Sequence, residues 1–149
     1  MTLLDALYES SEGLSKREAP RAVIVAVVND GVEYTNRFNR EVIERMKSVD
    51  AQFHAVTVGT MPPGSDTVTR ERSFVLQLGT KETGGQRILL LSPMGLDNAL
   101  GKLARELRSQ YKVVYNRPES LIPPEKLEID SARAGVTLRG SPMRGQTGA

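Results

Sequence analysis

The 149-residue sequence contains neither cysteine nor tryptophan, and its aromatic side chains are limited to three Phe and four Tyr. The absence of cysteine excludes disulfide bridges, thiolate nucleophiles and Cys-ligated zinc sites. The lone histidine, His54, excludes His-rich zinc sites and HExxH metalloprotease motifs. It falls inside a predicted strand, which favours a structural position over a catalytic one. Because rings are so few, the core must be built from Val, Ile, Leu and Ala.

Long apolar runs and an excess of one charge are also missing. The longest apolar run, 22–28, has seven residues, whereas a membrane-spanning helix needs about 20, so we expect no membrane span. The N-terminus has no basic segment and reaches Asp5 before any long apolar segment, so we expect no secretory signal in this chain. With 20 basic and 18 acidic residues, the near-balanced charge argues against nucleic acid as a partner.

The familiar catalytic motifs are absent from the sequence. It has no GxxxxGK[ST] phosphate loop and no GxSxG elbow, and the Gly84-Gly85 pair lacks the GxGxxG spacing. The acid pairs Glu9/Glu12 and Glu41/Glu44 share helix faces, where a solvated surface explains them better than acid–base work. We therefore expect a protein that is not an enzyme.

Helix-type and strand-type patterns alternate along the first 115 residues. Helices are predicted over 3–14, 39–47, 69–82 and 96–110, and strands over 22–28, 52–58, 87–91 and 111–115. This alternation predicts an α/β fold of three layers, with a mostly parallel, Rossmann-like sheet and helices on both faces. Thr83-Gly84-Gly85 is expected to end the third helix.

The run at 22–28 is the strongest local signal. It shows no polar alternation, which is typical of a central parallel strand buried on both faces. The chain nevertheless opens with a helix, so the strand that normally comes first in such folds is expected to be missing. A sheet truncated at its N-terminal side would leave an open edge beside 22–28, through which the chain could self-associate.

The composition divides the chain into three regions. Residues 1–116 are predicted to form the α/β domain. Residues 117–140 are predicted to form a Pro-rich loop and a short antiparallel extension, with strands at 126–130 and 136–139. Residues 141–149 are small and polar, and are predicted to be a disordered tail.

Asp30 directly follows the apolar run, and the carboxyl ends of parallel strands form the ligand crevice of open α/β sheets. A carboxylate there can bind a hard cation. The alternative is that Asn29-Asp30-Gly31 is only a turn that ends the strand. Gly31, Thr35 and Asn36 follow in the same loop and are the other candidate binding residues.

Four phrases occur in a characteristic order: Leu-Leu-Asp-Ala-Leu-Tyr at 3–8, Asp-Gly at 30–31, Glu-Thr-Gly-Gly at 82–85 and Glu-Leu-Arg-Ser-Gln-Tyr at 106–111. An Arg/Gly phrase follows at 133–140. This order resembles the von Willebrand factor type A domain, and more narrowly a type A-related class described from Acidobacteria and similar bacteria. The resemblance covers about residues 1–145, and the order is more specific than any single phrase.

The resemblance implies a metal-ion-dependent adhesion site built from three elements: a DxSxS motif after the first strand, a Thr before a helix, and an Asp after a later strand. Asp30 matches the third element, and Thr2 lies one residue from the expected position of the second. None of the six Asp residues begins a DxSxS motif. The site is therefore expected to be incomplete, with no cofactor bound in this chain unless Mg²⁺ finds further ligands upstream of Met1.

Type A domains generally mediate protein–protein contact, so the resemblance implies a non-catalytic module that binds a protein partner. One alternative is a small-ligand or nucleotide-dependent α/β enzyme that uses the crevice around Asp30, Thr35 and Asn36. Another is a fragment that pairs with a second chain through its open sheet edge. Members of the resembled class are commonly exported or envelope-associated, whereas this chain shows no signal, so the compartment stays open.

Overall fold

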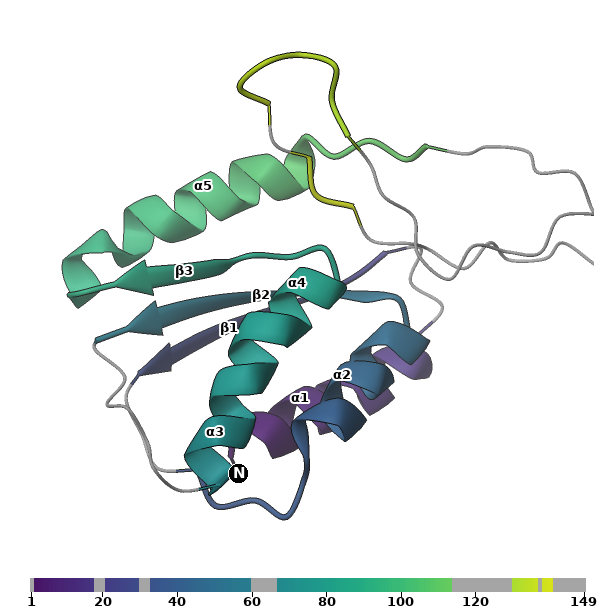
Figure 1. The fold of residues 1–149 in the computed structure, drawn as a ribbon, viewed down its shortest axis with the longest axis vertical. Helices are drawn as coiled ribbons and strands as arrows, with labels where there is room; N and C mark the ends of the chain where they lie inside the picture. The colour runs from purple at the N-terminus through teal and green to yellow at the C-terminus, as the bar shows by residue number, and fades with distance from the viewer. Residues whose placement is uncertain are drawn as a thin grey trace, which may run out of the picture.

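The computed structural model describes residues 2–17, 21–29, 33–59, 67–113, 130–136 and 138–140. Helices and strands alternate from the start of the chain to residue 108, as the sequence predicts (Figure 1). The elements are α1 (Leu3–Ser15), β1 (Ala22–Asn29), α2 (Asn39–Ser48), β2 (Ala51–Val58), α3 (Thr67–Phe74), the π-helix η1 (Val75–Gly79), α4 (Thr80–Glu82), β3 (Arg87–Leu90), the 3₁₀ turn η2 (Pro93–Gly95) and α5 (Leu96–Arg108).

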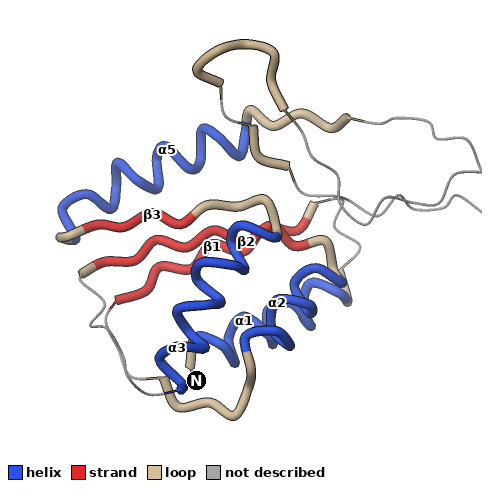
Figure 2. Tube along the Cα trace, in the orientation of Figure 1, coloured by secondary structure: helices blue, strands red, loops and turns tan. Residues whose placement is uncertain are grey.

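The three strands form one parallel sheet in the order β1-β2-β3. Ala22 lies opposite Ala51 at the start of the β1–β2 pair, and Ala55 lies opposite Arg87 in the β2–β3 pair. Helices α1, α2 and the continuous α3-η1-α4 helix lie on one face of the sheet, and α5 lies on the other (Figures 1 and 2). The predicted α/β architecture with a parallel sheet is confirmed.

The burial of β1 differs from the prediction. Strand β2 is the buried central strand, whereas no described strand pairs with the outer side of β1. Ile24 and Ala26 pack against the helical core, but Val25 and Val27 on the opposite face stay 41% and 50% exposed. An apolar run signals that a strand is buried, yet it cannot tell which strand has neighbours on both sides. Self-association through this edge stays a prediction.

A single apolar cluster joins α1, α2, η1 and β2 on one side of the sheet. Its largest ring is the fully buried Phe53 of β2, and the rest is aliphatic, as the shortage of aromatic residues requires. The buried members are Leu4, Leu7, Val42, Ile43, Met46, Phe53, Ala55, Val75 and Leu76.

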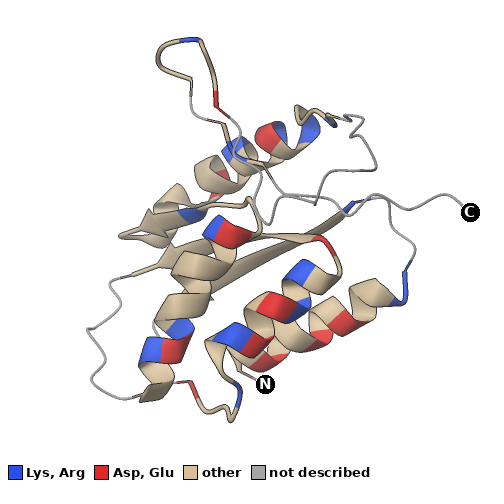
Figure 3. Ribbon diagram, turned by 45° about the vertical axis from the view of Figure 1, so that its right-hand side comes forward, with Lys and Arg blue, Asp and Glu red and all other residues tan. Residues whose placement is uncertain are grey.

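Helix α1 carries only acidic charged residues, whereas α2 carries both acidic and basic ones (Figure 3). The Lys47 ammonium lies 2.9 Å from the Glu44 carboxylate and 3.3 Å from that of Glu82. The Arg45 guanidinium lies 4.0 Å from Glu12. These acids therefore belong to a solvated, ion-paired helix surface, and such exposed pairs stabilise the fold only weakly.

The third helix ends at the glycine pair that the sequence singles out. Gly84 adopts a φ of +75°, and its amide donates to the Lys81 carbonyl at 3.3 Å, while the Gly85 amide donates to the Thr80 carbonyl at 2.8 Å. This is the Schellman arrangement that satisfies the last carbonyls of a helix. A Cβ atom at position 85 would lie 1.8 Å from the carbonyl oxygen of Phe53. The pair therefore has a structural role.

The region after α5 departs from the prediction where it is described. Residues 111–113 form no strand, since Tyr111 is 94% and Val113 is 80% exposed and neither finds a surface to pack on. The described ranges 130–136 and 138–140 contain a turn and no strand. Residues 114–129, 137 and 141–149, with the rest of the predicted extension and the tail, lie outside the described residues. None of the described helices is long and apolar enough to cross a membrane.

Two glycine-to-alanine substitutions distinguish a glycine that touches the backbone of β2 from one that has open space around it. Gly85→Ala is expected to destabilise the protein by about 3 kcal/mol, because its methyl group collides with the backbone of β2. Gly13→Ala, inside α1 with no atom within 4 Å of the added Cβ, is expected to stabilise it by about 0.5–1 kcal/mol. Urea denaturation measures both changes, and a Gly85→Ala midpoint equal to wild type would contradict the close contact.

Candidate functional site

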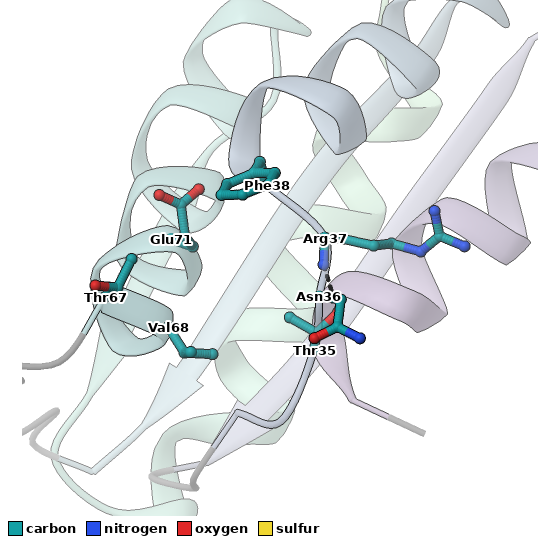
Figure 4. A pocket seen from close by; sticks show the side chains of 7 residues that line it. All are labelled: Thr35, Asn36, Arg37, Phe38, Thr67, Val68 and Glu71. Atoms are coloured by element: carbon teal, nitrogen blue, oxygen red, sulfur yellow. Dashed lines mark hydrogen bonds between the residues drawn. The ribbon is translucent and has the colours of Figure 1, made fainter.

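The candidate site lies beyond the carboxyl end of β1, between the start of α1, the loop 33–38 and the start of α3. The guanidinium of Arg72 on α3 donates to the backbone carbonyl of Asn29, the last residue of β1, at 2.6 Å. A depression of about 350 Å³, here called the crevice, opens beside this loop (Figure 4). Its lining residues are Thr35, Asn36, Arg37, Phe38, Thr67, Val68 and Glu71.

Asp5 ties the first turn of α1 to the loop after β1. Its carboxylate accepts hydrogen bonds from the hydroxyls of Thr2, at 2.5 Å, and Thr35, at 3.0 Å, and lies 3.3 Å from the Arg37 Nε. The Thr2 hydrogen bond, with Thr35 and Arg37 adding to it, lowers the pKa of Asp5 despite the opposing effect of its desolvation. We call Thr2, Asp5, Thr35 and Arg37 the Asp5 network.

Thr2 occupies the N-cap position of α1, directly before Leu3. Its hydroxyl donates to Asp5 instead of capping a backbone amide, so its oxygen keeps lone pairs that could still accept a bond. Asp5 itself was not among the predicted site residues, because an acid on an amphipathic helix reads as a solvated one. A sequence signal for Asp5 does exist. Thr2 and Asp5 have the Thr-x-x-acid spacing of a capping box, which indicates that the two side chains can interact.

The structure brings together only part of the predicted site. Thr35 lines the crevice, but its hydroxyl is committed, since it donates to Asp5 and accepts from the Arg37 amide at 3.1 Å. Asn36 lines the crevice and is exposed. Asp30 and Gly31 lie outside the described residues, so the structure does not place the main metal candidate. Thr2 and Thr35 therefore meet at Asp5, and Asn36 lies beside them.

The charge of Arg37 is neutralised within the protein. Its guanidinium lies 3.8 Å from the centre of the Tyr8 ring, in cation–π contact, and 2.6 Å from the Glu41 carboxylate. With Asp5 on its other side, Arg37 bridges α1 and α2. It therefore fixes one wall of the crevice and offers no spare positive charge to a ligand.

Two further acids are bound to helix starts. The carboxylate of Glu33, 4% exposed, accepts from the Leu4 amide at 3.0 Å and lies 4.0 Å from the Arg72 Nε. The carboxylate of Glu71 accepts from the amide and the side chain of Asn39, both at 2.6 Å, at the start of α2. Negative charge stabilises helix N-termini, whose first amides lack partners within the helix. These acids thus hold helices in place.

No group of three or more His, Asp or Glu side chains within the described ranges is arranged to hold a metal ion. Thr2 and Asp5 bring a hydroxyl and a carboxylate together at the start of α1, but the carboxylate is already bound by Thr35 and Arg37. Mg²⁺ keeps several waters but needs at least one available carboxylate in such sites, and the Asp5 carboxylate is engaged on both oxygens.

No family model and no curated protein matches the chain. Assignment to the type A domains therefore rests on the order of the sequence phrases, and it remains a proposal. The parallel α/β sheet with helices on both faces is compatible with a three-layer fold.

Asp5→Asn tests the network. Because the pKa of Asp5 is lowered in the folded protein from 3.8, its stabilisation is present above that value and is lost as pH falls through the folded pKa. We expect Asp5→Asn to cost about 1–2 kcal/mol at pH 7 and the difference from wild type to shrink below about pH 4.

Urea denaturation at a series of pH values measures this difference. Asp97→Asn is the matched control, since Asp97 is an exposed acid in the first turn of α5 and makes no side-chain hydrogen bond among the described residues. Equal losses in the two variants, or a loss that does not depend on pH, would show that the network contributes nothing beyond the charge at a helix start.

Proposed function

We propose that this chain is a non-catalytic protein-binding module of von Willebrand factor type A ancestry, with an incomplete metal-ion-dependent adhesion site. The observation that carries the proposal is a contact beside the crevice. The Asp5–Thr35 hydrogen bond joins the start of α1, with Thr2, to the loop that follows Asp30 in the sequence, and Thr35 of this loop lines the crevice. In the resembled domains these two segments contribute to the adhesion site.

The chemistry of the crevice favours binding over catalysis. Among the described lining residues, Glu71 is engaged at the start of α2 and Arg37 is paired with Asp5 and Glu41. Neither is placed as a free acid, base or phosphate clamp. These bonds instead hold the walls rigid, which lowers the entropic cost of binding a partner.

The crevice rim offers contact surface of the kind that protein interfaces use. Phe38, which lines the crevice, is 64% exposed, and Tyr34 in the preceding stretch is 80% exposed. Exposed aromatic side chains beside a rigid depression are typical anchors of protein–protein binding. Asn36 adds an exposed amide that can both donate and accept hydrogen bonds.

Site-specific photocrosslinking tests this proposal. A photoreactive phenylalanine at position 38 is compared with one at position 111, because Phe38 and Tyr111 are both exposed aromatic residues and only Phe38 lines the crevice. In cells that make the protein, we expect a light-dependent adduct of protein mass from position 38 and none from position 111. Val68→Glu, which places a charge in the crevice, should abolish it.

Three outcomes would contradict the proposal. Equal adducts from both positions would indicate non-specific contact, and no adduct from position 38 would leave the crevice without a protein partner. A nucleotide that co-purifies with the chain and is detected by mass spectrometry would favour the alternative of a nucleotide-dependent α/β enzyme.

A further inference from the structure

His54 is a fully buried imidazole in the central strand. Its neighbours in β2, Phe53 and Ala55, face the helical core, so His54 points to the opposite face, where α5 lies. Gln52, two residues earlier on the same face, accepts a hydrogen bond at 3.0 Å from Gln110 just beyond α5. Neither ring nitrogen of His54 has a hydrogen-bond partner among the described residues.

Three charged side chains from different segments of the chain affect the pKa of His54. Glu106 lies on α5, Arg139 in the range 138–140, and Arg21 directly before β1. Burial lowers the pKa of His54; Glu106 opposes this effect, while Arg139 and Arg21 add to it.

The only one of these groups that could stabilise a charged imidazole is already engaged. Glu106 pairs with Arg139 through one carboxylate oxygen and accepts from Gln86 at 3.0 Å through the other. Arg21 donates to the Leu107 carbonyl on α5 at 2.9 Å, which keeps its positive charge on this side of the sheet. A proton on His54 would thus create a buried cation near two arginines. Its counter-ion among these groups, Glu106, is already paired with Arg139.

We propose that His54 makes the attachment of α5 to the sheet sensitive to acid. Helix α5 covers this face through the buried side chains of Ala99 and Leu103. The neutral imidazole fits the resulting apolar site, whereas the imidazolium requires water or a counter-ion. Release of α5 brings water to the ring, so proton uptake favours the released state.

The direction of the effect follows from the lowered pKa. The released state, with an ordinary imidazole, binds the proton more readily than the closed state. The attachment is therefore complete above the ordinary value of 6.5 and weakens as pH falls below it, until the folded pKa is reached. Within that window the equilibrium constant for release rises by up to about tenfold per pH unit.

Release would uncover the face of β2 and β3 beneath α5, which carries Val56 and Ile88 in register with each other. That surface would extend the apolar stripe of Val25 and Val27, which is already exposed on β1. The acid form would thus present a contiguous apolar surface that is covered at neutral pH. This inference does not depend on the proposed function of the crevice.

Hydrogen exchange of the full chain between pH 7.5 and 5 tests the proposal, with protection factors corrected for the intrinsic pH dependence of exchange. We expect protection of α5 amides to fall by up to about tenfold per pH unit below about 6.5, while protection in α2 stays constant. In His54→Phe, which has no titrating group at this position, α5 protection should not change with pH.

Loss of protection in α5 and α2 together would mean global unfolding and would overturn the proposal. So would a His54→Phe variant that responds to pH as the wild type does. Should His54→Phe fail to fold, His54→Leu and the wild-type imidazole resonance serve instead. Because His54 is the only histidine in the sequence, that resonance is unambiguous, and titration near 6.5 without release of α5 would refute the mechanism.

Discussion

Two reciprocal hydrogen bonds to carboxylates hold the first turn of α1 against the loop after β1. Glu33 of the loop accepts from the Leu4 amide of the helix, and Asp5 of the helix accepts from the Thr35 hydroxyl of the loop. Helix amides without partners need such acceptors, and the acids gain from the positive end of the helix. This reciprocal pair fixes where α1 begins relative to the sheet, and the crevice forms beside it.

The same principle sets the chemical character of the crevice. Glu71 from α3 caps the start of α2, and Arg72, next to it, reaches the Asn29 carbonyl at the end of β1. The charged groups Glu33, Glu71 and Arg72 thus hold the starts of α1 and α2 and helix α3 near the carboxyl end of β1. What faces solvent is a rigid depression with an exposed amide and an exposed ring, from Asn36 and Phe38. Such a surface suits recognition of another protein.

The sequence pattern predicted the elements from 3 to 108 well, because helices α1, α2 and α5 each bury one apolar face and β2 is a buried strand of mostly apolar residues. The glycine pair at 84–85 was also predictable, since its backbone role leaves a local signature. The partial exposure of β1 could not be predicted, because it depends on which strands lie beside β1 in the sheet. The prediction of a strand was wrong at 111–113, because a segment of strand-like composition forms a strand only where it can pair with a sheet. At the candidate site the sequence singles out Thr2, Thr35 and Asn36, and these stay predictions. Asp5 was not predicted, because only its Thr2 contact is local in sequence, whereas Thr35 and Arg37 lie 30 or more residues away.

We propose that the crevice belongs to a binding module whose metal site is incomplete in this chain. Titration of Mg²⁺ and Mn²⁺ into the full chain by isothermal calorimetry tests it most directly. We expect no saturable binding at micromolar metal, because the Asp5 carboxylate is already bound by Thr2, Thr35 and Arg37. Saturable binding at micromolar metal that disappears in Asp30→Ala would contradict it.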